Sequence, residues 1–172
     1  LRHTIPDSVS LKDFGFSNYS GDYKGAPVEG TFSPDGKFIL SANEGEPNTD
    51  YSQDPNGTIS IIETSTYTVT TLDFASFAGQ AAALAKDGFR ISKFAKTFAQ
   101  DIEPEYITIS DDSKTAWVTL QENNAVAVVN LATNRIDRII PMGYKNHGLA
   151  TNSIAPSDKV SATSPFVLKP YA

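Results

Sequence analysis

The stretch "TISDDSKTAWVTLQE", Thr108–Glu122, decides the fold, because a closely similar stretch occurs earlier in the chain. That earlier copy, "TFSPDGKFILSANE" at Thr31–Glu44, has threonine, serine, aspartate and lysine at matching positions, 77 residues before. Each copy predicts a short strand, a tight turn at Pro34–Gly36 or Asp111–Ser113, and a second apolar strand. The repeat therefore predicts two β-hairpins of the same design.

A second pair of similar stretches extends each hairpin. "GTISIIETSTYTVTTL" from Gly57 parallels "NAVAVVNLATNRIDRII" from Asn124, 67 residues later, and each predicts a strand, a polar turn and another strand. In "AVAVVNL" both alternating faces are apolar, which favours a strand with neighbours on both sides. Each copy thus contains four strands, and Trp117, the only tryptophan, is expected in the core.

A four-stranded repeat of about 40 residues is typical of a β-propeller blade. We therefore predict an all-β, β-propeller-like fold of four-stranded antiparallel blades with one inserted helix. The helix is expected at about Ser76–Asp87, where Phe77, Ala81 and Leu84 recur at helical spacing and Gly88 follows. Because a propeller needs about four blades or more, the ring is expected to be incomplete in this chain.

The domain organisation follows from these patterns. We expect an N-terminal segment at 1–27 with at most one strand, near Ser8–Leu11, a propeller-like portion at 28–159 and a tail at 160–172. The propeller-like portion is expected to divide into a blade at 28–74, a helical insertion at 75–100, a second blade at 101–143 and the start of a next segment at 144–159.

The fall of the repeat offset from 77 to 67 locates an insertion of ten residues in the first copy. The insertion lies within "NEGEPNTDYSQDPNG", Asn43–Gly57, in which Pro47 and Pro55 exclude a helix or a central strand. At the same junction the second copy has only the short "QENN". An acid-rich loop has thus been added at one defined corner of the repeat.

Acidic residues at this corner form the candidate site. The loops at one end of successive propeller blades converge, so carboxylates that follow equivalent strands are expected on one rim, together with the acidic segment "QDIEPEY" that leads into the second blade. Two interpretations stay open: a solvated acidic loop, or oxygen ligands for Ca²⁺. The candidate metal ligands are Glu44, Glu46, Asp50, Asp54, Glu103, Glu105 and Glu122, with Asp101 beside them.

Composition narrows the possible functions. The chain has 20 acidic and 14 basic residues, and its net charge of −6 argues against nucleic-acid binding. Cysteine is absent and histidine occurs twice, which excludes cysteine-ligated zinc and histidine-rich metal sites and leaves hard cations bound by oxygen. No apolar run is long enough to predict a transmembrane segment. Asn18 and Asn56 begin sequons for N-glycosylation.

Two long motifs, "SANEGEPNTDYSQDPNGTISII" and "AQDIEPEYITISDDSKTAWVTLQENNAVAVVNL", resemble the choice-of-anchor I family, and the resemblance runs from about Val28 to Asp158. It implies a longer β-propeller-like domain that is secreted or attached to the cell surface, which adds weight to the two sequons. The family includes mesenchyme-specific cell-surface glycoproteins of biomineralisation, and some bacterial members carry an alkaline-phosphatase-like label. The pattern stops after Lys159, so the chain is expected to be a fragment or to lack parts of the domain.

Three functions are compatible with these features. The first is a non-enzymatic extracellular module, acidic and calcium-binding, in a matrix, coat or surface assembly, with other copies or other matrix or surface proteins as partners. The second is a metal-dependent phosphoester hydrolase, and the third is a propeller that binds protein or glycan without metal. We favour the first, because histidine is scarce and the sequence shows no activated nucleophile.

Overall fold

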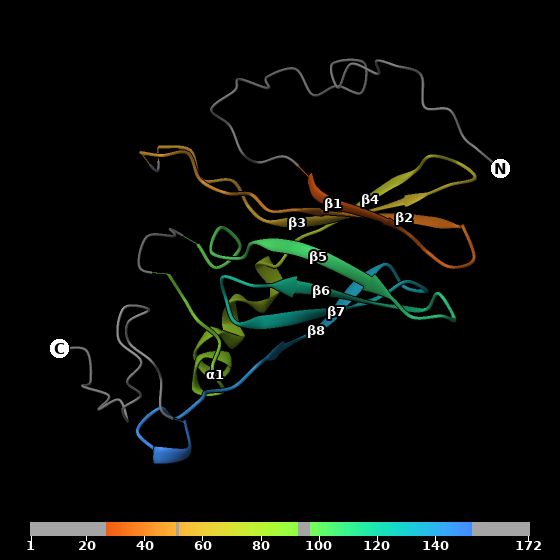
Figure 1. The fold of residues 1–172 in the computed structure, drawn as a ribbon. Coiled ribbons are helices and arrows are strands. Elements are labelled where there is room, and N and C mark those ends of the chain that lie inside the picture. Colours follow the sequence, from red (N-terminus) through yellow and green to blue (C-terminus); the bar gives the residue numbers. More distant parts are fainter. Residues whose placement is uncertain (1–26, 51, 93–96, 153–172) are drawn as a thin grey trace, which may run out of the picture.

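The computed structural model describes residues 27–50, 52–92 and 97–152, and two open, four-stranded antiparallel sheets dominate them (Figure 1). Sheet A contains, in consecutive order, β1 (Pro27–Phe32), β2 (Phe38–Asn43), β3 (Thr58–Glu63) and β4 (Val69–Leu72). Sheet B contains β5 (Pro104–Ile109), β6 (Thr115–Leu120), β7 (Ala125–Asn130) and β8 (Arg135–Pro141). Each sheet is one copy of the repeat, so the predicted all-β class and four-stranded sheets are confirmed.

Sheet A has one buried face, which we call its front face. Alternation along β2 and β3 places Leu40 opposite Ile61 and Ala42 opposite Ile59, and all four side chains are buried. Leu72 of β4 continues this row beside Ile59. Complete burial of a large aliphatic side chain contributes about 1.5–3 kcal/mol, so this face anchors sheet A in the core.

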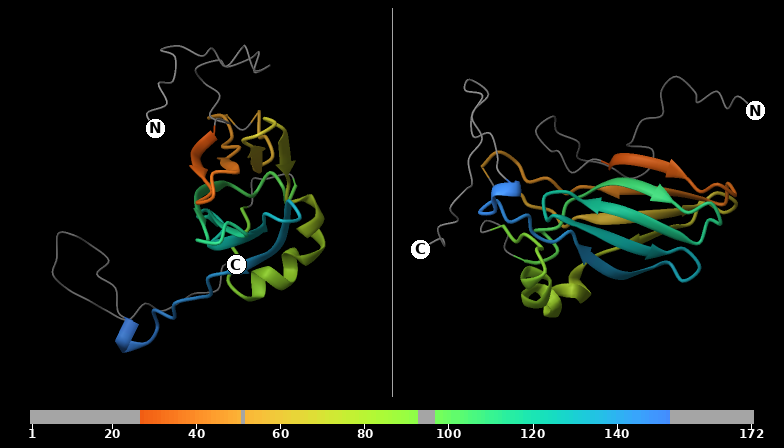
Figure 2. Two further views of the ribbon diagram at one scale, coloured as in Figure 1. Left: turned by 90° about the vertical axis from the view of Figure 1, so that its right-hand side faces the viewer. Right: turned by 60° about the horizontal axis from the view of Figure 1, so that its bottom comes forward.

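Sheet B also has one buried face, which we call its back face. Its central row consists of Ile107, Val118, Ala127 and Ile139, paired across all four strands and all buried. These residues belong to the same continuous hydrophobic core as the front face of sheet A. The two sheets therefore pack face to face, as the stacked ribbons show (Figures 1 and 2).

The prediction that Trp117 lies in the core was wrong. Its side chain is 38% exposed, because Trp117 belongs to the opposite face of β6 from the buried Ala116 and Val118. The sequence pattern could not decide between the faces, since both carry apolar residues in this sheet.

A helical segment separates the two sheets in sequence, as predicted for about Ser76–Asp87. It consists of a 3₁₀ helix, η2 (Ala75–Gln80), followed by α1 (Ala81–Lys86). The buried Phe77 and Leu84 attach it to the core, and α1 lies beside β8 (Figure 2). The α-helix ends before Gly88, which has a φ of +105° as expected for a helix C-terminus.

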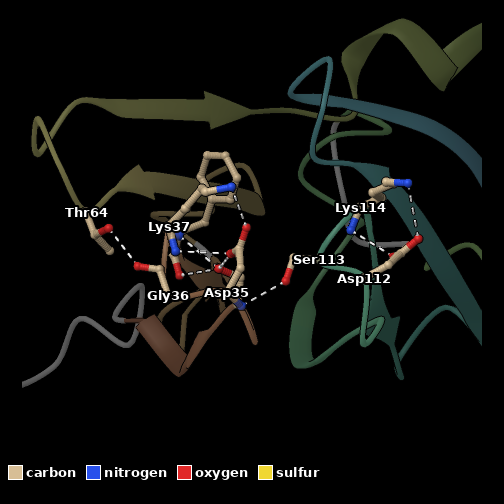
Figure 3. Close-up of polar contacts among 9 residues, drawn as sticks. Asp35, Gly36, Lys37, Thr64, Asp112, Ser113 and Lys114 are labelled. Atoms are coloured by element: carbon tan, nitrogen blue, oxygen red, sulfur yellow. Dashed lines mark hydrogen bonds and ion pairs between the residues drawn. The ribbon is translucent and has the colours of Figure 1, made fainter.

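The hairpin turns of the two copies meet at one end of the sheets (Figure 3). Asp35 and Asp112 each accept a hydrogen bond from the backbone N–H two residues later, at 3.1 Å, so their side chains cap their own turns. The N–H of Asp35 also donates to Oγ of the buried Ser113 at 3.0 Å. This contact joins the two copies directly.

A short 3₁₀ helix, η3 (Ala150–Asn152), follows sheet B. The strand predicted near Ser8–Leu11 and the tail predicted at 160–172 lie outside the described residues.

Candidate functional site

The end of the sheets opposite the hairpin turns collects three acidic segments. They are the β2–β3 loop, the β6–β7 turn and the segment that leads into β5, and both views of the ribbon place them at the same end (Figures 1 and 2). We call this the loop end of the molecule. Its carboxylates that influence one another electrostatically are Glu44, Glu46, Asp54, Asp101, Glu103, Glu105 and Glu122.

Gly57 allows the acidic β2–β3 loop to lie against the segment before β5. Its N–H donates to the carbonyl oxygen of Ala99 at 3.1 Å, and a Cβ at this position would lie 1.9 Å from the carbonyl oxygen of Ile102. Gln100 adds a second link, since its Nε2 donates to the carbonyl oxygen of Asp54 at 2.5 Å. The absence of a side chain at Gly57 thus brings two acidic segments together.

Glu103 lies at the centre of this charge. Partial burial is the largest cause that raises the pKa of its carboxyl, and the negative charges of four neighbours add to it, so that the pKa rises from 4.5 to about 7. The four neighbours, in order of effect, are Glu44, Glu122, Glu46 and Asp101. The predicted convergence of the acidic loop, the β5 lead-in and the β6–β7 turn is therefore observed.

Asp101 is held in place by hydrogen bonds. It is buried, and burial raises its pKa to about 6, with a further contribution from the charge of Asp54. Its carboxyl accepts hydrogen bonds from the N–H of Ser92 at 2.7 Å and from Nδ2 of Asn123 at 3.0 Å, which oppose that rise. The buried Asn123 also donates to the backbone carbonyls of Arg90 and Asp101. This network fixes the β6–β7 turn to the lead-in segment.

Glu122 and Glu105 complete the acidic group. Glu122 forms an exposed ion pair with Arg90, in which Nη2 and Oε2 are 2.6 Å apart. Glu105, in β5, is buried, and burial together with the charge of Glu122 raises its pKa. Arg90 is the one basic side chain that appears among the charges acting on this group within the described part of the chain.

Asp50 lies apart from the other predicted ligands. It is exposed at the tip of the β2–β3 loop, where the hydroxyl and the N–H of Ser52 lower the pKa of its carboxyl. Asn48 and Gln53 close this tip with two hydrogen bonds of 3.0 Å. Asp50 does not appear among the charges that act on Glu103, Asp101 or Glu105. The structure thus gives Asp50 a local role in the turn.

Sequence reasoning missed two residues of this site, Arg90 and Asn123. Arg90 follows the helical segment and reaches Glu122 across 32 positions, which no local pattern signals. Asn123 was visible only as part of "QENN", and its burial depends on its contact with Asp101.

Other features of the sequence are placed as follows. Across 27–50, 52–92 and 97–152, no three acidic or histidine side chains are already arranged to hold a metal ion. In the same residues no helix is long and apolar enough to cross a membrane. Asn56, which begins one sequon, is exposed, whereas Asn18 lies outside the described residues.

Comparison with known proteins gives one family and one structural similarity. A family model described as the choice-of-anchor I domain matches residues 25–165. Among solved structures, the chain is similar to the hydrazine synthase of Kuenenia stuttgartiensis, with 19% identity and a TM-score of 0.43. The similarity covers 74% of this chain and 26% of that one, so this chain spans about a quarter of its length. The comparison with curated proteins gives no match.

Proposed function

Since the chain belongs to the choice-of-anchor I domain family and is thereby a surface-associated module, we propose that it acts outside the cell as a non-enzymatic module whose loop end binds Ca²⁺. Its place would be a matrix, coat or surface assembly. The single observation that supports cation binding is the convergence of Glu44, Glu46, Asp101 and Glu122 on Glu103.

The electrostatics of the loop end favour a bound cation. Carboxylates that repel one another and are partly withdrawn from water are stabilised when a divalent ion lies between them. Ca²⁺ accepts six to eight oxygen ligands in variable geometry, which suits carboxylates from three separate segments better than the stricter octahedron of Mg²⁺. Binding would lower the pKa of Glu103 and release its proton near pH 7.

Coordination of Ca²⁺ would require side-chain rotation, because no three carboxylates in the described part of the chain are already arranged to hold an ion. The β2–β3 loop and the β6–β7 turn supply Glu44, Glu46 and Glu122 from half-buried or exposed positions. Fixing each of these side chains in one rotamer costs about 1–2 kcal/mol, so we expect a moderate affinity for Ca²⁺, as in extracellular calcium modules.

Thermal unfolding followed by the fluorescence of Trp117 tests the proposal at pH 8. A hundredfold excess of Ca²⁺ over its Kd should raise the Tm by about 5 °C or more relative to EDTA, and Mg²⁺ should have a smaller effect. Calorimetric titration at pH 7 in two buffers of different ionisation enthalpy should reveal proton release on binding. The Kd for Ca²⁺ should be at least about tenfold higher for Glu103→Gln and for Glu46→Gln, so the rise in Tm at a given Ca²⁺ concentration should be smaller.

The matched control is Asp111→Asn, which removes an exposed carboxylate from the hairpin-turn end and should leave Ca²⁺ binding unchanged. A Tm that does not respond to Ca²⁺, or an equal response in all three variants, would reject the calcium site. Hydrolysis of a phosphate monoester that is lost in Glu103→Gln and Glu46→Gln would instead support the hydrolase alternative.

Glycosylation is a separate part of the proposal. Asn56 is exposed beside Gly57 in the sequon Asn56-Gly57-Thr58, where a glycan could be attached without entering the core. Expression through a eukaryotic secretory pathway should give a chain that loses mass on treatment with an N-glycosidase. An Asn56→Gln variant should lack the part of that mass due to this position.

A further inference from the structure

Asn56 and Gly57 stand directly before β3 at the loop end, and they form the only Asn–Gly pair in the sequence. Asparagine is chemically labile when the next backbone nitrogen can reach its side chain, and glycine, which has no Cβ, obstructs that approach least. Asn56 is exposed to water. The pair therefore has the sequence and the exposure of a deamidation site.

Deamidation at such a pair needs no enzyme and no cofactor. The backbone nitrogen of Gly57 loses its proton to solvent and attacks Cγ of Asn56. A bond from this nitrogen to Cγ forms, the bond from Cγ to Nδ2 breaks, and Nδ2 takes up a proton and leaves as ammonia. Water then opens the succinimide ring at either carbonyl, which gives aspartate or isoaspartate. The reaction thus requires a free Gly57 nitrogen and rotation of the peptide between the two residues.

The folded loop end encloses the nitrogen of Gly57. Gly57 is buried, and its N–H donates to the carbonyl oxygen of Ala99 at 3.1 Å. The backbone of Gly45 also packs closely against it, since a Cβ on Gly45 would lie 2.9 Å from the Gly57 nitrogen. The carbonyl oxygen of Ile102 lies where a Cβ of Gly57 would be, at 1.9 Å. This nitrogen is therefore bonded and has little space for ring closure.

Neighbouring contacts hold the pair from both sides in sequence. Before it, the carbonyl oxygen of Asp54 accepts a hydrogen bond from Nε2 of Gln100 at 2.5 Å. After it, Thr58 pairs with Asn43 of β2, and Nδ2 of Asn43 donates to Oγ1 of Thr58 at 3.0 Å. Rotation of the Asn56–Gly57 peptide would require this region to open locally.

We propose that Asn56 is a deamidation site that the folded loop end keeps closed, and that it reacts when the start of β3 detaches from the segment before β5. The rate of deamidation is then proportional to the population of the open form, as for other reactions of a transiently opened state.

The isoaspartate product would prevent the region from closing again. Isoaspartate adds one carbon to the main chain, which moves Gly57 along the strand. Gly57 has no room for this movement, because its Cα lies directly against the carbonyl of Ile102. Deamidation would therefore make a reversible local opening permanent.

Peptide mapping by mass spectrometry measures the reaction, with the chain expressed in a host without N-glycosylation and incubated at pH 8 in EDTA. Conversion of Asn56 should be at least about tenfold slower in the folded chain than in the same chain unfolded in urea. Gln100→Ala removes the hydrogen bond to Asp54 and should raise the folded-state rate about two- to tenfold. Hydrogen exchange of the Gly57 amide should rise by the same factor, and circular dichroism verifies folding.

Gln121→Ala is the matched control, because it shortens an exposed glutamine in the β6–β7 turn and should leave the rate unchanged. A folded-state rate less than about tenfold below the unfolded rate would overturn the proposal, as would a Gln100→Ala variant that reacts no faster than Gln121→Ala. An isoaspartate product whose Gly57 amide is as protected from exchange as in the parent would overturn the permanent opening. Because EDTA removes Ca²⁺, these results are independent of the proposed cation site.

Discussion

Replacing Glu103 by glutamine should stabilise the protein at high pH. The pKa of Glu103 is raised from 4.5 to about 7 by burial and by the charges of Glu44, Glu122, Glu46 and Asp101. Its ionised form is therefore disfavoured in the folded state relative to the unfolded chain. Glutamine keeps the shape and the burial of the side chain but carries no charge, so it removes this penalty.

The magnitude follows from the linkage between the pKa and stability. A difference between 4.5 and about 7 corresponds to about 3 kcal/mol. Partial solvent exposure screens such interactions, so we expect a gain of about 1–2 kcal/mol in the free energy of unfolding at pH 8. Because a raised carboxyl pKa means that the folded state binds more protons, the penalty grows as pH rises from 4.5 through about 7 and is absent below pH 4.5.

Urea unfolding at pH 8 and at pH 4.5, followed by Trp117 fluorescence in EDTA, measures this difference. Glu103→Gln should exceed the parent by about 1–2 kcal/mol at pH 8 and match it at pH 4.5. Asp111→Asn, at the hairpin-turn end, corrects for the general effect of removing one negative charge. An equal gain at both pH values, or a loss at pH 8, would show that Glu103 does not carry repulsion in the folded state.

Three further predictions concern the contacts that shape the fold. Gly57→Ala should lower the free energy of unfolding by more than about 2 kcal/mol in urea, because its Cβ would lie 1.9 Å from the carbonyl oxygen of Ile102, and intact stability would contradict this. Ser113→Ala should cost about 1–2 kcal/mol by leaving the N–H of Asp35 without its partner, and an unchanged free energy of unfolding would contradict this. Asn123→Ala should cost about 2–4 kcal/mol and increase hydrogen exchange in the β6–β7 turn, and unchanged exchange would count against its bridging role.

The repeat predicted most of the fold because its signals are local. Alternation and the turns at Asp35 and Asp112 were sufficient to locate all eight strands of the two sheets. The insertion within Asn43–Gly57 also predicted the loop end, since equivalent strands end on the same side of equivalent sheets. What the pattern could not give was the buried face of sheet B, because Val126 and Val128 are as apolar as Ala127 and Val129.

Only the site residues that directly follow equivalent strands could be predicted from the sequence. Glu44, Glu46 and Glu122 follow the second strand of each copy, so their common position followed from topology. Arg90 reaches the site from the helical segment, whose path depends on tertiary packing. Asp50 was included because of its charge, but hydrogen bonds with Ser52 close a local turn and hold it apart.

The pKa values of carboxyl groups shift in opposite directions at the two ends of the molecule, which supports a functional role for the loop end. At the hairpin turns, the hydroxyl of Ser33 and the N–H of Lys37 lower the pKa of Asp35 to about 2, and Ser110 and Lys114 do the same in direction for Asp112.

At the loop end, burial and neighbouring negative charges raise the pKa of Asp101, Glu103 and Glu105. Solubility and turn formation do not require acidic residues from three segments to surround a half-buried carboxyl, because this arrangement costs free energy through charge repulsion and burial. The repulsion is relieved at neutral pH by a proton on Glu103 or by a cation, and only a cation relieves it above pH 7 without removing charge from the site.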